Sequence, residues 1–213
     1  MAIQTIAIDT KEELISVLED LDYFDMVENN ASTNQIECSI GSDVVLKIPS
    51  STSTAVSLEF FTTSESRTVS TGSLTLPRIV YRTRNGIMAV KGLEGSSSTN
   101  SGNYALIIGK TNNGAIACAF TGKGGTTGKY DVKPGAVGEW SSDITSTIKA
   151  MQSEWSTSPQ ITSIPIPTHP SNGVSYIKGA KAVMCGPLLN TGIVTINNVE
   201  HATYGVIMLS DEA

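Results

Sequence analysis

The sequence contains few of the residues from which proteins build metal centres and nucleophilic active sites. Its three cysteines, Cys38, Cys118 and Cys185, are far apart and form no C-x-x-C pair, so neither a disulfide framework nor a zinc-binding cysteine pair is predicted. Histidine occurs only at His169 and His201, and neither lies in a recognised nucleophile or metal motif. We therefore expect no catalytic residues, no metal ion and no cofactor.

Basic charge and long apolar runs are also scarce. The chain has 14 Lys and Arg against 20 Asp and Glu, with a formal net charge of −6. Nucleic-acid-binding proteins usually present a basic stripe to the phosphates, so DNA or RNA is not an expected partner. No apolar run reaches the ~18 residues that a membrane helix needs, and Asp9 interrupts the N-terminus before any signal-like stretch. The sequence predicts a protein without a membrane segment, folded in a cytoplasm.

Two Asn-Gly dipeptides lie between runs of alternating apolar and polar residues, at residues 78–91 and 104–120. A two-residue β-hairpin loop needs positive φ at both central positions, which Asn and Gly adopt at little cost. We therefore predict one hairpin that turns at Asn85-Gly86 and another that turns at Asn113-Gly114. The 26 Ser, 24 Thr and 19 Gly of the chain also suit strands and hydrogen-bonding turns.

One amphipathic helix is predicted near the N-terminus. Thr10 and Glu13 form a capping box, and the apolar residues after them recur at helical spacing over residues 11–21. From residue 23 the spacing of apolar residues changes to every second position, which predicts strands at 23–28, 35–40, 44–48 and 55–61. The expected fold is thus mainly β (α+β), an antiparallel meander or sandwich with one N-terminal helix.

We expect one main unit over residues 1–213. After the β meander of residues 23–121, the segment 122–160 is interpreted as a Gly-rich linker, and Ile144, Ile148, Met151 and Trp155 have the spacing of a second, short helix. A C-terminal β segment follows over residues 161–213. It begins with a proline-rich edge strand at 162–170 and continues with strands at 174–177, 180–184, 193–196 and 204–209, with a turn at Asn197-Asn198 before a short strand at 199–200.

Two sequence features are candidates for ligand sites. The glycines and lysine of residues 122–130 resemble a phosphate-binding loop, but the spacing differs, Tyr130 replaces the Ser or Thr that holds magnesium, and no helical pattern follows. Aromatic rings in loops can stack on a sugar, which makes Trp140, Trp155 and Tyr130 candidates for glycan binding, although packing in a core or an interface is the more common role of such residues.

Charge is unevenly distributed along the chain. Residues 1–28 carry a net charge of −7 and residues 67–133 a net charge of +7. Two solvated faces are one explanation. The other is that surfaces of opposite sign on neighbouring subunits meet in an assembly.

Two parts of the sequence resemble a known group of proteins. They are residues 104–117 (YALIIGKTNNGAIA) and the C-terminal stretches 176–180, 192–200 and 204–212. Both are similar to small tail- or baseplate-associated structural proteins encoded in prophages of Gram-positive gut bacteria. The resemblance implies a component of a phage tail, or of a remnant particle, that works by assembly and brings no catalytic residues.

These observations favour a non-enzymatic structural protein of a phage or prophage virion, in the tail or baseplate, made in the bacterial cytoplasm. The expected partners are further copies of the chain in a homo-oligomer, other virion proteins and a host-surface glycan. Two alternatives stay open. A carbohydrate-binding or receptor-binding adhesin would expose its tryptophans together on one face, and a hydrolase would place His169 or His201 in a concave pocket beside a Ser, Cys or acid.

Overall fold

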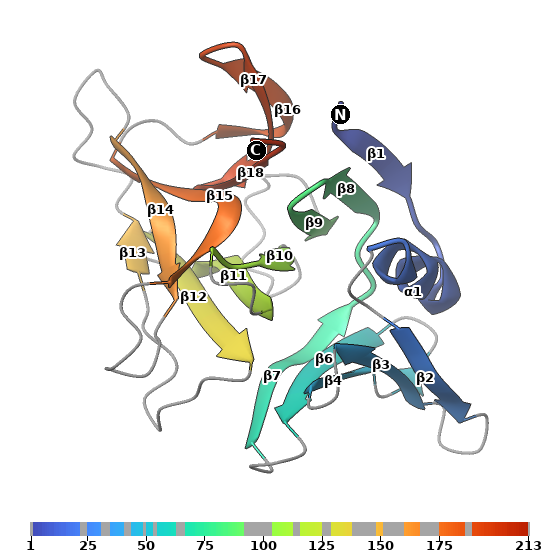
Figure 1. Ribbon diagram of the computed structural model, residues 1–213. Helices are drawn as coiled ribbons and strands as arrows, with labels where there is room; N and C mark the ends of the chain where they lie inside the picture. Colours follow the sequence, from blue (N-terminus) through green and yellow to red (C-terminus); the bar gives the residue numbers. More distant parts are fainter. Residues whose placement is uncertain are drawn as a thin grey trace. The chain divides into compact units, whose positions relative to one another are not determined.

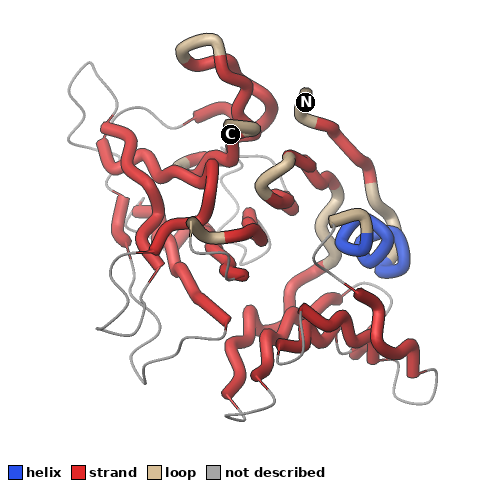
Figure 2. Tube along the Cα trace, in the orientation of Figure 1, coloured by secondary structure: helices blue, strands red, loops and turns tan. Residues whose placement is uncertain are grey.

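The protein is mainly β, as the sequence predicts, and neighbouring strands from β2 to β18 pair in the antiparallel direction (Figures 1 and 2). Within the described residues there is one α-helix, and no helix is long and apolar enough to cross a membrane. The computed structural model describes residues 2–21, 25–30, 35–40, 44–48, 50–52, 55–62, 67–91, 104–112, 116–124, 129–137, 148–150, 160–166, 175–185 and 189–212.

The chain forms two compact units, where the sequence led us to expect one. The first comprises residues 7–78, and the second comprises residues 1–6 together with residues 79–213. The predicted continuous meander over residues 23–121 is therefore interrupted between Thr75 and Ile79. Pro77 lies in this interval and has no N–H to donate to a ladder, which favours the end of one sheet at this point.

The unit of residues 7–78 contains the helix and a six-stranded sheet. Its strands are joined in the order β2-β3-β4-β6-β5, and β7 also pairs with β6. The elements are α1 (Lys11–Glu19), β2 (Asp25–Asn30), β3 (Gln35–Ile40), β4 (Val44–Ile48), β5 (Ser50–Thr52), β6 (Ala55–Thr62) and β7 (Arg67–Thr75).

The predicted capping box of α1 is confirmed. The Oγ1 of Thr10 accepts the Glu13 N–H at 3.2 Å, and the Glu13 carboxylate accepts the N–H groups of Asp9 and Thr10 at 2.6 and 3.1 Å. These hydrogen bonds, the one from Asp9 most strongly, lower the pKa of Glu13. They satisfy backbone donors that the first turn of a helix leaves unpaired, so the helix starts where the sequence predicts.

The second unit contains two sheets. A seven-stranded sheet has the order β1-β8-β9-β10-β11-β12-β13, and a five-stranded sheet has the order β14-β15-β18-β17-β16. The strands of the first are β1 (Gln4–Ala7), β8 (Ile79–Thr83), β9 (Gly86–Lys91), β10 (Tyr104–Lys110), β11 (Ile116–Gly124), β12 (Lys129–Val137) and β13 (Ile148–Ala150). Those of the second are β14 (Gln160–Ile166), β15 (Ser175–Cys185), β16 (Leu189–Ile196), β17 (Val199–Gly205) and β18 (Ile207–Ser210).

The two sheets of the second unit share one apolar core, which makes this unit sandwich-like. Alternate residues of each strand point into it, because successive side chains of a strand face opposite sides of the sheet. Met88, Ala105 and Ile107 enter from the seven-stranded sheet, and Tyr204 and Leu209 enter from the five-stranded sheet. The opposite face of the five-stranded sheet is therefore left for other contacts.

The first Asn-Gly hairpin forms, but its turn lies one residue earlier than predicted. The last backbone pair joins Thr83 to Gly86, so the two-residue loop is Arg84-Asn85. The Asn85 N–H donates to Thr83 Oγ1 at 3.1 Å, and the buried Asn85 side chain donates to carbonyls of the C-terminal segment. These contacts override the local preference for an Asn-Gly turn.

Only glycine fits at position 86, because the backbone of β9 lies very close to that of β10 there. A Cβ atom on Gly86 would lie 2.1 Å from the Ile108 carbonyl oxygen, and its φ of +153° is unfavourable for other residues. The neighbouring Lys110 N–H donates to the Asn85 carbonyl at 3.3 Å. The hairpin tip is therefore held against β10 by backbone contacts that leave no room for a side chain.

The second Asn-Gly hairpin also forms, with a longer loop than predicted. The last pair of β10 with β11 is Lys110 with Ile116, so five residues separate the strands, and Asn113-Gly114 lies outside the described residues. Thr111 instead forms a bridge with Ile177 of the other sheet. The prediction of a two-residue turn is therefore wrong, because the residue that follows β10 pairs with β15 of the other sheet instead of turning directly into β11.

The predicted turn at Asn197-Asn198 is confirmed. Ile196 pairs with Val199, and the two asparagines have φ values of +52° and +64°. Positive φ at both central positions is the requirement of a type I′ turn. The strand that follows is longer than the predicted residues 199–200, because it continues as β17 to Gly205.

The prediction of a Gly-rich linker with a second helix over residues 122–160 is wrong where the structure describes it. Lys129–Val137 is a strand that pairs with β11, and residues 148–150, inside the predicted helix, form β13. Among the described residues, β13 pairs only with Tyr130 to Val132, which leaves the end of β12 that contains Pro134 at an edge, where a proline is tolerated. The other residues of the predicted helix, Ile144, Met151 and Trp155, lie outside the described residues.

The strand predicted at 204–209 is wrong, because the chain turns at Val206 and the segment is divided between β17 and β18, which pair with each other. The edge strand predicted at 162–170 is present as β14, at the edge of its sheet, over Gln160–Ile166. The strands predicted at 174–177 and 180–184 are one strand, β15, which runs through Gly179 at a φ of +70°.

Replacement of Gly86 tests the close approach. We expect Gly86→Ala to lower the free energy of unfolding by about 4 kcal/mol, because the new methyl group would overlap the backbone of β10. Gly192→Ala is the matched control, since Gly192 has a φ of +144° and nothing lies within 4 Å of the position that its new methyl group would take. It should cost about 1–2 kcal/mol from backbone strain alone. Urea unfolding measures both, and equal losses would contradict the overlap.

Candidate functional site

The aromatic residues proposed for glycan stacking are not brought together by the described part of the structure. Trp140 and Trp155 lie outside the described residues. Tyr130 lies on β12, where its backbone pairs with Lys123 and Ala150, but its side chain is outside the described part. Their role as a stacking surface stays a prediction.

The segment that resembles a phosphate loop forms part of a hairpin. Residues 122–124 end β11, and residues 129–130 begin β12, with Gly124 paired to Lys129. A phosphate loop requires a helix whose N-terminus faces the phosphate, and a strand occupies that position here. The strand–turn–strand context therefore differs from that of a nucleotide site.

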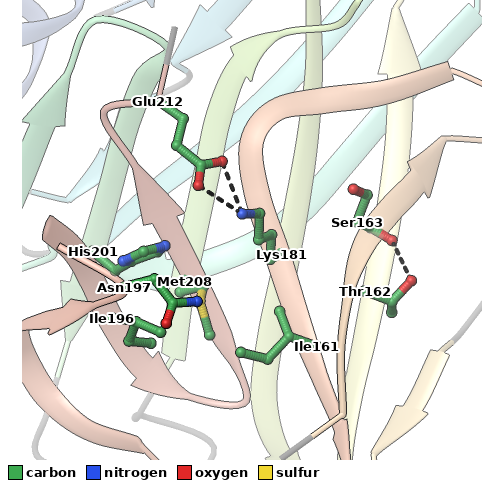
Figure 3. Close-up of a pocket in the computed structure, with 9 residues that line it drawn as sticks. All are labelled: Ile161, Thr162, Ser163, Lys181, Ile196, Asn197, His201, Met208 and Glu212. Atoms are coloured by element: carbon green, nitrogen blue, oxygen red, sulfur yellow. Dashed lines mark hydrogen bonds and ion pairs between the residues drawn. The ribbon is translucent and has the colours of Figure 1, made fainter. Parts of the chain in front are cut away.

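A pocket of about 280 Å³ lies on the face of the five-stranded sheet that points away from the sandwich core (Figure 3). Met208 and His201 point to this side because their neighbours Ile207, Leu209 and Ala202 point into the core. The described residues that line the pocket are Ile161, Thr162, Ser163, Lys181, Ile196, Asn197, His201, Met208 and Glu212.

An ion pair crosses one side of the pocket. Lys181 Nζ donates to both carboxylate oxygens of Glu212, at 2.9 and 2.8 Å (Figure 3). The hydrogen bond from Lys181 lowers the pKa of Glu212, against an opposing effect of burial. Glu212 is therefore a carboxylate at neutral pH, and the charges of the pair cancel within the pocket.

His201 is the most buried polar side chain of the pocket, with 3% of its surface exposed. Its Nδ1 lies 2.9 Å from the Val199 carbonyl oxygen, which can only accept, so Nδ1 carries the proton in the neutral ring. Nε2 is then an acceptor. Since His201 lines the pocket, that acceptor is the part of the ring left for a ligand.

The pocket brings His201 together with Ser163 and Glu212, which are residue types of a hydrolytic triad. In a triad the carboxylate accepts the Nδ1 proton of the histidine while Nε2 faces the serine. Here His201 Nδ1 is hydrogen-bonded to the Val199 carbonyl, and the Glu212 carboxylate is paired with Lys181. In the view of Figure 3, the Lys181 side chain lies between those of Glu212 and Ser163. These three residues therefore do not form the chain of hydrogen bonds, from carboxylate to histidine to serine, that a triad requires. His169, the other candidate, lies outside the described residues.

The C-terminal segment is held in place by the β8–β9 turn. Asn85 Nδ2 donates to the carbonyls of Ser210 and Glu212 at 3.0 and 2.7 Å. The Arg84 N–H donates to Asp211 Oδ1 at 2.7 Å, and its guanidinium pairs with Asp211 Oδ2 at 3.2 Å. Burial acts to raise the pKa of Asp211, but the hydrogen bonds from Arg84 lower it overall. We call these contacts the C-terminal clamp.

The end of the β16–β17 hairpin extends past the strand beside it (Figure 1). We call residues 193–200 the arm. Within the described residues, β18 pairs with β17 only between His201 and Tyr204, so residues 195–200 of the arm are two strands paired with each other alone. β16 is also the last strand of its sheet in the described part. Ile193, at the base of the arm, pairs with Ala202 and is 40% exposed.

The two sides of the arm differ in their surroundings. Ile196 and Asn197 line the pocket, and the Glu200 carboxylate accepts the Ile3 N–H at 3.3 Å. Ile193 and Thr195 are exposed and alternate with Ile196, so they share the other face with Glu200, the partner of Thr195 in β17. One face of the arm therefore completes the pocket, and the other carries Ile193, Thr195 and Glu200.

Sequence reasoning missed both the pocket and the arm. Lys181 and Glu212 are 31 residues apart, so nothing local indicates that they pair. One signal was alternation: Lys181 stands between Ala180 and Ala182, which marks it as the outward residue of a strand with a buried inner face. Strand order, which places that residue beside the C-terminus, does not follow from alternation.

The chain has no match among protein-family models, curated proteins or solved structures at the significance required of a relative. The site is therefore interpreted from its own geometry.

The ion pair of the pocket is tested by removing its cation. In Lys181→Met the burial of Glu212 is no longer offset, so we expect the pKa of the Glu212 carboxyl to rise. A carboxylate whose pKa is lowered by folding stabilises the fold above its unfolded pKa, and this contribution is lost as the pH falls through the folded pKa. The variant should therefore be less stable than wild type at neutral pH, by about 1 kcal/mol or less for a partly exposed pair, and the difference should shrink in acid.

The measurement is an NMR titration of the Glu212 carboxyl together with urea unfolding at several pH values. Lys178→Met is the control, because Lys178 lies on the same strand and is exposed. An unchanged Glu212 titration in Lys181→Met would show that the pair does not hold the carboxylate.

Proposed function

We propose that this protein is a non-enzymatic structural protein of a phage or prophage virion, part of the tail or baseplate, that works by assembling with copies of itself and with other virion proteins. The observation that carries the assembly role is the arm. It includes β16, the last strand of its sheet in the part of the chain that the structure describes, and the exposed side chain of Ile193.

An open edge strand is a surface that proteins usually protect. Its unpaired N–H and C=O groups are a template for another strand, and charged residues, prolines or covering segments commonly block it. Residues 191–196 of β16 contain no charged residue and no proline. An edge of this composition is suited to strand addition, in which backbone hydrogen bonds give affinity and alternate side chains give specificity.

The arm also gains stability from a partner. Two strands paired only with each other are marginal in water, and a third strand or a packed face is needed to make such a ribbon rigid. Pairing between the arms of two copies would supply both, and a two-fold contact of this kind is self-complementary. The assembly role therefore explains why apolar residues occupy an extension outside the core.

The virion setting rests on the resemblance described above. Its stretches coincide with the β10–β11 hairpin and with strands β15 to β18, so they belong to the sandwich-like unit and include the arm. Synthesis in a bacterial cytoplasm followed by incorporation into the particle is the corresponding location.

We expect the purified protein to form a homo-oligomer, and Ile193→Asp to convert it to a monomer, because a charge on the edge strand β16 would be buried without a partner in the contact. Sedimentation equilibrium measures the mass of both. Since Ile193 is exposed, the monomeric variant should retain the wild-type circular dichroism spectrum. A wild-type monomer, or an oligomer that survives the substitution, would contradict assembly through the arm.

The virion assignment has a separate test. Particles released after prophage induction should contain the chain, detected by mass spectrometry after density-gradient purification, and particles from a strain that encodes Ile193→Asp should lack it. A chain that stays with the cell lysate while tail proteins sediment with the particles would contradict the assignment.

A further inference from the structure

The pocket is small and its lining is mixed. Its volume of about 280 Å³ is just below the ~300–1,000 Å³ typical of small-molecule sites, which suits one ring rather than an extended chain. Polar groups come from Lys181, Glu212, His201, Asn197 and the hydroxyls of β14, so donors and acceptors are both present.

A buried acceptor faces this pocket. His201 is 97% buried, yet the Val199 carbonyl engages only its Nδ1. Because His201 lines the pocket, a hydroxyl donor placed there would hydrogen-bond to Nε2. The site is therefore preorganised for a ligand that donates a hydrogen bond at this point.

The charges of the pocket exclude ionic ligands more strongly than neutral ones. Lys181 and Glu212 neutralise each other at 2.8 Å, so the pocket offers a donor and an acceptor side by side without net charge. A carboxylate or an amine would have to compete with the existing ion pair. Two neighbouring hydroxyls, each able to donate and to accept, could bond to Lys181 and to Glu212 without breaking the ion pair.

Apolar side chains form the rest of the wall. Ile161, on β14, is 38% exposed, and Met208 and Ile196 line the pocket beside it (Figure 3). They provide contact for the C–H groups of a ring whose hydroxyls reach the polar side. A ligand with an apolar face and a polar rim is required to use both.

We propose that this pocket binds a single neutral hexopyranose ring, the terminal residue of an uncharged glycan, through Lys181, Glu212 and His201 with Ile161 and Met208 as the apolar wall. This site goes beyond the assembly role, and it uses other residues than the aromatic candidates Trp140, Trp155 and Tyr130. A vicinal pair of ring hydroxyls bridges the Lys181–Glu212 ion pair, and a further hydroxyl donates to His201 Nε2.

The proposal is tested with the full-length protein and the methyl glycosides of glucose, galactose and N-acetylglucosamine at millimolar concentrations. The chain has two histidines, so the imidazole nitrogens of His201 are resolved in a long-range ¹H–¹⁵N spectrum of labelled protein. We expect at least one glycoside to shift His201 Nε2 and the amides around Lys181 and Glu212, with a millimolar dissociation constant. The methyl glycoside of glucuronic acid should bind at least about tenfold more weakly.

Two substitutions separate the polar and apolar parts of the site. Glu212→Gln leaves Lys181 with an uncompensated charge, so it should weaken the neutral glycoside about tenfold and strengthen the glucuronide. Ile161→Ala should weaken binding of the neutral glycoside and leave the preference for it unchanged. Tyr176→Ala is the matched control, because Tyr176 lies in the same sheet with the same 38% exposure and does not line the pocket.

Several results would overturn the proposal. They are the absence of any shift at His201 with all three glycosides, a glucuronide that binds wild type as well as the neutral sugars do, or Glu212→Gln with wild-type affinity and preference. Shifts that are abolished by Tyr176→Ala would also overturn it. The mass of the protein in solution is a separate measurement, so failure here leaves the assembly role to its own test.

Discussion

The C-terminal clamp is the contact on which the arrangement of the second unit depends. One side chain, Asn85, satisfies two carbonyls from a distant part of the chain, those of Ser210 and Glu212. It is buried to 93%, so no solvent competes for these hydrogen bonds. A Cβ atom on Gly179 would lie 2.7 Å from Asn85 Nδ2, which means that the glycine leaves the space that the amide occupies. The clamp thus joins the turn of one sheet to the end of the other.

The pocket and the arm both depend on the path of the C-terminal residues, which the clamp directs away from the sheet after β18. β18 ends at Ser210, and the next two residues leave the sheet toward Arg84 and Asn85. Among the described residues, β17 therefore has no neighbour on its β18 side beyond His201, and the end of the arm remains a two-stranded extension. The same departure places the Glu212 carboxylate beside Lys181, where it closes one side of the pocket. A single set of hydrogen bonds thus sets the two-stranded extension that forms the arm and the charge balance proposed for sugar binding.

Local signals in the sequence predicted the elements that depend on neighbouring residues. The capping box of Thr10 and Glu13, the type I′ turn at Asn197-Asn198 and the mainly β fold required no information from distant residues. The turn at Asn85-Gly86 was displaced by contacts with residues more than a hundred positions away. The strand at 129–137 contradicts its Gly-rich composition, because nine pairs with β11 outweigh weak propensity. Sequence pattern could not place Lys181, His201 and Glu212 together, because that depends on strand order.

The clamp is tested most directly by the free energy of unfolding of Asn85→Asp, measured in urea at neutral and at acidic pH. The substitution keeps the shape of the side chain but replaces two donors by acceptors that face two carbonyls, so we predict a loss of about 3–5 kcal/mol at neutral pH. The buried carboxyl should have a raised pKa, and protonation restores one donor, so the loss relative to wild type should shrink as the pH falls. A variant within about 0.5 kcal/mol of wild type at both pH values would contradict the central role of the clamp.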